Sequence, residues 1–126
     1  MHYFTDIEEI AHDNDIGIMD TEFESVDGVC MNGSKGYLVV VDSRLSPYHR
    51  RWTIAHELGH IADNTVNSRH SRIAESRADR LAIDILIPDH ILGQAIDDYG
   101  NDCDFLPQLF GVSHETMEKK YQKMFS

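Results

Sequence analysis

Two histidines and a glutamate fall within the five residues His56-Glu57-Leu58-Gly59-His60, near the middle of the chain. In a helix, residues four positions apart lie on one face, so both imidazoles could bind the same ion. Glu57 lies one position further round, within reach of a water molecule at that ion. Two imidazole ligands beside a carboxylate general base are typical of zinc-dependent peptidases. The spacing therefore predicts His56 and His60 as metal ligands and Glu57 as the catalytic residue.

The surroundings of this pattern favour metal binding over a chance match. The flanking side chains are those of a core helix: Trp52, Ile54, Ala55, Leu58, Ile61 and Ala62. Buried imidazoles and a buried carboxylate need polar partners, and one cation satisfies all three. A glycine inside a helix costs about 1 kcal/mol relative to alanine. Gly59 therefore predicts the close approach of another backbone or of a substrate between the two histidines.

A catalytic zinc ion usually takes a third protein ligand and leaves its fourth position to water. A second helical pattern places Glu75 and Asp79 four residues apart, on one face. We predict Glu75 as the third ligand, and Asp79 as the carboxylate that accepts the free ring N–H of a ligand histidine. Alternatively, both carboxylates are solvated and pair with neighbouring arginines. His70 is a competing third ligand, but it lies in a polar connector and ranks lower.

These motifs resemble those of the ImmA/IrrE-type metallopeptidases, which are bacterial and phage proteins of the gluzincin kind. The matching segments are residues 51–60, 75–82, 85–88 and 110–113, within a resemblance that extends from about Gly36 to the C-terminus. Three positions depart from the family pattern: Leu81 replaces Phe, Ile87 replaces Met, and Asp79 stands where Asn is commoner. None of these is a predicted ligand. The N-terminal third matches no pattern of the family.

The resemblance implies a zinc endopeptidase that cleaves a helix-turn-helix repressor of a phage, a mobile element or a stress response. The protein would then be an anti-repressor, with one Zn²⁺ per chain. A set of two histidines and one carboxylate also tolerates Mn²⁺ or Fe²⁺. Tyr48 or His49, ahead of the ligands, could donate a hydrogen bond to an oxyanion. Both could equally be surface residues, and the sequence assigns neither.

The length and the net charge of the chain limit the kinds of protein that it can be. The 126 residues predict one domain, 1–126, with a modest core. The net charge of −11 argues against direct binding of nucleic acid or anionic membranes, and suits a basic protein partner. No apolar run is long enough to span a membrane, and the first residues are not a signal peptide. We therefore expect a cytoplasmic protein in which Cys30 and Cys103 are reduced thiols.

The periodicity of apolar residues predicts an α+β fold. Helices are expected over residues 5–15, 46–64, 71–86 and 88–99, and strands over 16–26, 29–31 and 36–42. Turn signals at Asp27-Gly28 and Asn32-Gly33 favour a small, mostly antiparallel sheet. The family resemblance implies that this sheet packs on zincin-like helices. By analogy with zincins, an edge strand beside the metal helix would dock the substrate as an added strand.

The tail from Phe105 predicts a helix-turn-helix-like pair, in which Gly111 ends one helix and Ser113 caps the next. A DNA-binding module is thus a second class of function. Glu115 and Glu118 argue against it, because they lie in the would-be recognition helix. We expect instead that this pair closes the hydrophobic core behind the metal helix. A third class is a catalytically silent metal-binding sensor, although such a protein has no need of Glu57.

Overall fold

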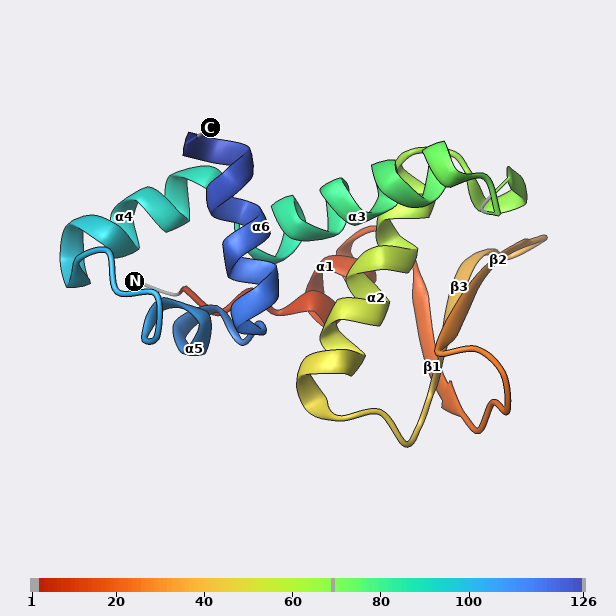
Figure 1. Ribbon diagram of the computed structural model, residues 1–126. Helices are drawn as coiled ribbons and strands as arrows, with labels where there is room; N and C mark the ends of the chain where they lie inside the picture. The colour runs from red at the N-terminus through yellow and green to blue at the C-terminus, as the bar shows by residue number, and fades with distance from the viewer. Residues whose placement is uncertain (1–2, 69, 126) are drawn as a thin grey trace.

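A computed structural model describes residues 3–68 and 70–125 of the chain. Over these residues the chain forms six α-helices, one short 3-10 helix (Val66–Ser68) and a three-stranded sheet. Figure 1 shows the sheet on one side of a central helix and the C-terminal helices on the other. The predicted α+β class is confirmed. None of the described helices has both the length and the apolar character to cross a membrane.

The sheet is small and mixed. Its strands are β1 (Gly17–Thr21), β2 (Gly28–Gly33) and β3 (Gly36–Asp42), in the order β1-β3-β2. β2 and β3 form the expected antiparallel hairpin, whereas β1 pairs with β3 in parallel. The sheet is therefore mixed: the expected antiparallel pairing holds for β2 and β3, but not for β1 and β3. A parallel pairing is possible because the loop 22–27 separates β1 from β2 and carries the chain to the opposite edge of β3.

The hairpin turn lies two residues after the predicted Asn32-Gly33 signal. Gly33 pairs with Gly36 in the β-ladder, so residues 34 and 35 form the turn. Gly36, rather than Gly33, has the positive φ of 109° that L-residues rarely adopt. The strand predicted over residues 16–26 is shorter than expected and ends at Thr21.

The metal motif lies on the central helix α2 (Pro47–Ala62), which begins and ends close to the predicted boundaries. Ser46 caps its N-terminus by accepting a hydrogen bond from the His49 backbone N–H at 3.3 Å, and Pro47 occupies the first turn. Most residues from Arg51 to His60 are buried, because the helix packs on the sheet and on the next helix. This burial explains the apolar sequence around the motif.

Helix α3 (Arg72–Leu86) crosses α2 at Gly59, and Ser71 caps its first turn. A Cβ atom at Gly59 would lie 2.6 Å from the carbonyl oxygen of Ala78. Only glycine permits this approach, which brings the first two turns of α3 to the histidine face of α2. The prediction that another backbone approaches closely at Gly59 is confirmed.

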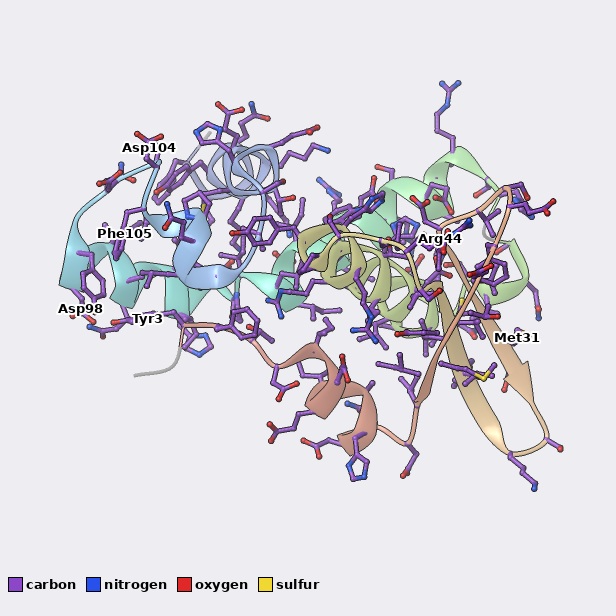
Figure 2. All side chains as sticks on the ribbon, turned by 90° about the horizontal axis from the view of Figure 1, so that it is seen from below. Tyr3, Met31, Arg44, Asp98, Asp104 and Phe105 are labelled. Atoms are coloured by element: carbon purple, nitrogen blue, oxygen red, sulfur yellow. The ribbon has the colours of Figure 1, made fainter. Side chains whose placement is uncertain are left out.

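The C-terminal part contains α4 (Asp89–Tyr99), α5 (Leu106–Phe110) and α6 (His114–Phe125), and α1 (Ile7–Asp13) precedes the sheet. Gly111, with a φ of 65°, separates α5 from α6. Phe110 and Met117 are buried in the core that also contains Ile54 of α2. The helix-turn-helix-like pair therefore closes the core, as expected. Figure 2 shows Asp104 and Phe105 at this end of the molecule, with Met31 and Arg44 at the sheet end.

Candidate metal centre

The side chains of His56, His60 and Glu75 converge between α2 and α3. The two imidazole Nε2 atoms are 3.2 Å apart. Glu75 Oε2 lies 3.0 Å from Nε2 of His56, and Glu75 Oε1 lies 2.7 Å from Nε2 of His60. In a tetrahedral zinc site with bonds of about 2.0–2.1 Å, neighbouring ligand atoms are about 3.3 Å apart. The two Nε2 atoms and the two carboxylate oxygens of Glu75 thus lie almost as far apart as the ligands of one ion, and their chemistry suits a borderline-soft divalent cation.

Glu57 lies beside this cluster, and its side chain is buried together with His60. The ligand atoms of His56, Glu57 and His60 all lie within 4.8 Å of one another. The structure therefore gathers all four residues that the sequence assigned to metal binding and catalysis. It brings Glu75, rather than His70, into contact with both histidines. His70 is exposed and lies on the wall of the adjoining cavity.

The hydroxyl of Thr65 orients the imidazole of His60. Nδ1 of His60 lies 3.0 Å from Thr65 Oγ1, and the same hydroxyl donates to the His60 carbonyl at 3.4 Å. Since the hydroxyl proton is used in this way, Oγ1 accepts the Nδ1–H of the ring. This tautomer leaves the lone pair of Nε2 directed at Glu75 and His56. Sequence reasoning missed Thr65; the signal was a hydroxyl residue five positions after a ligand, just beyond the end of the helix.

Asp79 contacts the imidazole of His56. Its Oδ1 atom lies 2.8 Å from Nδ1 of His56, close enough for an ion pair although not aligned as a regular hydrogen bond. Asp79 is one turn beyond Glu75 on α3, so the two carboxylates approach opposite nitrogens of the same ring. The contact that the sequence predicted for Asp79 with a ligand histidine is therefore present in the geometry. Its role in orienting a ligand remains a prediction.

The two imidazoles have different protonation tendencies. Burial would lower the pKa of His56, but the carboxylates of Asp79, Glu75 and Glu57 outweigh burial and raise it above 6.5. The pKa of His60 is lowered, first by its burial and then by repulsion from His56, which Glu75 and Glu57 offset only in part. His60 is consequently the imidazole that more readily presents a free lone pair. A metal ion must displace a proton mainly from His56.

A cavity of about 700 Å³ opens beside the cluster. One wall is formed by the first part of β2 and the residues before it, and the other by α2 and α3, from which Trp52, Glu57 and Glu75 contribute. Near its rim, His49 Nε2 lies 2.8 Å from Asp27 Oδ2 and joins the start of α2 to the start of β2. Tyr48 is half-exposed and lines a neighbouring cavity instead. A peptide in this cleft could reach both the cluster of His56, His60 and Glu75 and the side chain of Glu57.

Comparisons with known proteins identify the family and a similar fold. The sequence pattern of the family described as the IrrE N-terminal-like domain, a peptidase family, matches residues 11–122. A solved Mycobacterium tuberculosis transcriptional regulator has a similar fold, with a TM-score of 0.73 and 19% sequence identity. The match covers 95% of this chain and 41% of that chain, so this chain spans about two-fifths of the regulator's length. No curated protein matches. The chain belongs to the IrrE N-terminal-like peptidase family.

Proposed function

We propose that this protein is a metal-dependent endopeptidase in which His56, His60 and Glu75 hold Zn²⁺. The observation that carries the proposal is the convergence of two imidazole Nε2 atoms, 3.2 Å apart, on the carboxylate of Glu75, beside the buried carboxylate of Glu57. One oxygen of Glu75 lies 3.0 Å from Nε2 of His56, and the other lies 2.7 Å from Nε2 of His60. An open cleft next to this cluster gives a peptide access to it. Membership of a peptidase family supports the same reaction class.

In the proposed peptide hydrolysis, the ion and the side chains of the protein would have different roles. A bound zinc ion would polarise the peptide carbonyl and lower the pKa of water at the site. Glu57 acts as the general base: it takes a proton from the attacking water and passes it to the leaving amine. Thr65 and Asp79 hold the imidazoles in the tautomers that turn Nε2 toward the ion.

We propose further that the substrate is a helix-turn-helix transcriptional repressor. The resemblance to the ImmA/IrrE-type metallopeptidases supports this substrate class. The solved protein of similar fold is named a transcriptional regulator, although its name states no substrate. A repressor with a basic DNA-binding surface would also be attracted to a chain with a net charge of −11.

Direct DNA binding through α5 and α6 has less support. The lysines that make the end of this pair basic are engaged by carboxylates of the same chain. Lys119 Nζ lies 3.5 Å from Glu115, Lys120 is fully buried against Asp84, and Lys123 also contacts Asp84. Phosphate contacts need accessible cations. These lysines therefore give this surface little attraction for nucleic acid.

The experiment compares the wild-type chain with His60→Ala and Glu57→Gln. Elemental analysis is expected to find about one zinc per chain in the wild type and in Glu57→Gln, and little in His60→Ala. Cleavage of a purified helix-turn-helix repressor, for example one encoded beside this gene, is expected to fall about 10²–10⁴-fold in Glu57→Gln. Equal cleavage by Glu57→Gln and the wild type would refute the general-base role. A zinc-loaded chain that cleaves no repressor would favour the sensor.

A further inference from the structure

A row of aromatic rings runs from the core to the surface at the end of the molecule opposite to the sheet (Figure 1). The ring centroids of Phe110 and Tyr3 are 6.2 Å apart. From Tyr3 the row continues to Tyr99 at 5.8 Å and then to Phe105 at 5.3 Å. Phe110 is buried, whereas Tyr99 and Phe105 are 53% and 37% exposed. The two exposed rings are therefore held in place by packing that reaches the core.

Carboxylates accompany both exposed rings. Asp98 directly precedes Tyr99, and Asp104 directly precedes Phe105. Two further aspartates lie close by in the sequence, and all four are exposed: Asp97, Asp98, Asp102 and Asp104. The sequence has no lysine or arginine between residues 81 and 118. Within residues 3–68 and 70–125, no ion pair joins these aspartates to a cation, so the described side chains leave their charge unneutralised.

Hydrogen bonds hold Asp98 beside the row of rings. Its carboxylate accepts one bond from the phenol of Tyr3 and another, at 2.8 Å, from the side-chain amide of Gln94. These two bonds hold the pKa of Asp98 below 3.8, so the group is ionised at neutral pH. Figure 2 shows Asp98 and Tyr3 at the same end of the molecule as Asp104 and Phe105.

Asp102 orders the loop that carries the second exposed ring. Its Oδ1 atom accepts from the backbone N–H groups of Asp104 and Phe105, at 2.9 and 3.1 Å. The side chains of Asp97 and Asp104 form no hydrogen bond in the part of the chain that the structure describes. The surface thus combines rings and carboxylates that are fixed with carboxylates that can still take a partner.

Among the charged groups of proteins, the guanidinium of arginine suits this combination best. It is planar and weakly hydrated, it stacks on aromatic rings, and it can donate to both oxygens of a carboxylate at once. The ammonium of lysine is compact and strongly hydrated, so it gains less from a ring at the surface. Phosphates and other anions are repelled by the carboxylates.

We propose that Tyr99, Phe105 and the four aspartates beside them form a docking surface for an arginine-bearing basic segment of a partner protein. This aromatic–acidic surface is remote from the metal cluster, because Glu75 lies in the first turn of α3 and Tyr99 is the last residue of α4. Figure 1 shows these two helices extending away from the sheet one after the other. The inference therefore does not depend on the proposed peptidase activity.

The test uses the full chain and fluorescein-labelled synthetic peptides of equal length that carry arginine, lysine or glutamine at the same positions. In fluorescence anisotropy at low salt, the arginine peptide is expected to bind about threefold more tightly than the lysine peptide, and the glutamine peptide is expected not to bind. Phe105→Leu keeps an apolar side chain but removes the ring, and should remove most of the preference for arginine. Phe105→Trp, the matched control, should keep that preference.

A second pair of variants locates the charge. Asp97→Asn combined with Asp104→Asn should weaken binding of the arginine peptide about threefold. Glu22→Gln combined with Glu24→Gln removes two exposed carboxylates from the loop after β1, at the sheet end, and should weaken it less than about twofold. Equal weakening by the two pairs would overturn the proposal, because net charge alone would then attract the peptide.

Three other results would also overturn the proposal. Equal affinity for the arginine and lysine peptides would show that the rings contribute nothing to recognition. Failure of every peptide to bind at low salt would show that the surface takes no basic segment. If the chain dimerises in sedimentation experiments and Phe105→Leu prevents it, the surface binds a second copy of the chain, and the assignment to a partner protein is wrong.

Discussion

Helix α3 contributes carboxylates to two clusters of polar side chains that are built in different ways. At its C-terminal end, Asp84 meets Lys120 at 3.0 Å and also contacts Lys123, while Asp89 reaches the same Lys120. Lys120 is fully buried, so two carboxylates cover one ammonium group. Near its N-terminal end, the described partners of Glu75 are the imidazoles of His56 and His60. One cluster therefore pairs permanent charges, and the other pairs a carboxylate with titratable rings.

The difference indicates which cluster is built for an ion. Two lysines and two aspartates neutralise one another, so the cluster around Lys120 is complete as it stands and ties α6 to α3 and α4. In the cluster around Glu75, two Nε2 lone pairs and a carboxylate converge within 3.2 Å. Only protons or a cation can satisfy such an arrangement. A burial pattern that looks similar in both places thus ties helices together in one, and in the other it suits the metal binding that we propose.

The largest expected effect is on zinc affinity, which should depend on the cluster around Glu75 and not on the cluster around Lys120. Glu75→Ala removes one of three ligands and is expected to weaken zinc binding by more than about a hundredfold, since even residues behind the ligands contribute 10–100-fold. The matched change Asp84→Ala, on the same helix, should leave zinc affinity unchanged. Competition with a chromogenic chelator measures both. Undiminished affinity in Glu75→Ala would pass the ligand role to another residue, with His70 as the first candidate.

The next effect tests the residue that sequence reasoning missed. Thr65→Ala leaves the Nδ1–H of His60 without its acceptor and is expected to weaken zinc binding about 10–100-fold. Thr65→Ser keeps the hydroxyl and should bind zinc within about twofold of the wild type. The same chelator competition applies. If the alanine variant binds zinc as tightly as the serine variant, the Thr65 hydroxyl does not orient the ligand.

A smaller effect is expected in stability when the Lys120 cluster is opened. Lys120→Met keeps the length of the buried side chain but removes its charge, leaving two half-exposed or exposed carboxylates facing an apolar group. The free energy of unfolding is expected to fall by about 1–2 kcal/mol in urea denaturation, with zinc content unchanged. Lys119→Met breaks only an exposed pair and should change it by less than about 0.5 kcal/mol. Equal effects of the two changes would show that burial of Lys120 contributes nothing.

The parts of the site that could be read from the sequence are those set by helical geometry. The spacing of His56 and His60, and of Glu75 and Asp79, places each pair on one face of a helix, whatever the rest of the fold. Gly59 could be interpreted because a glycine inside an apolar helix needs a reason, and the reason proved to be the backbone of α3 at Ala78. Capping by Ser46 and Ser71 is equally local.

The parts that could not be read depend on how the chain turns between elements. Thr65 reaches His60 because Asn64 adopts a positive φ of 57°, and the backbone N–H of Thr65 then donates to the His60 carbonyl at 2.9 Å. No periodic pattern predicts such a turn. Likewise, the sequence of β1 does not indicate which edge of β3 it joins. The sequence around Lys120 predicts only a basic helix end, because Asp84 and Asp89, which surround Lys120, lie far from it along the chain. Side-chain contacts between distant segments decide all three.

The smallest expected effect is a pH dependence confined to the Lys120 cluster. Partial burial would raise the pKa of Asp84, but hydrogen bonds from Lys123 and Lys120 outweigh it and hold the pKa below 3.8. A carboxyl group whose pKa is lower in the folded state stabilises the fold above its unfolded pKa, and this contribution is lost as the pH falls through the folded value.

Because Asp84 is 44% exposed, solvent screening limits its contribution to about 0.5 kcal/mol. Asp84→Asn should therefore be less stable than the wild type by about this amount at pH 7, and urea denaturation should find the gap closing below pH 3.8. A gap that does not narrow at all as the pH falls below 3.8 would mean that Asp84 stabilises the helix junction through packing rather than through its charge.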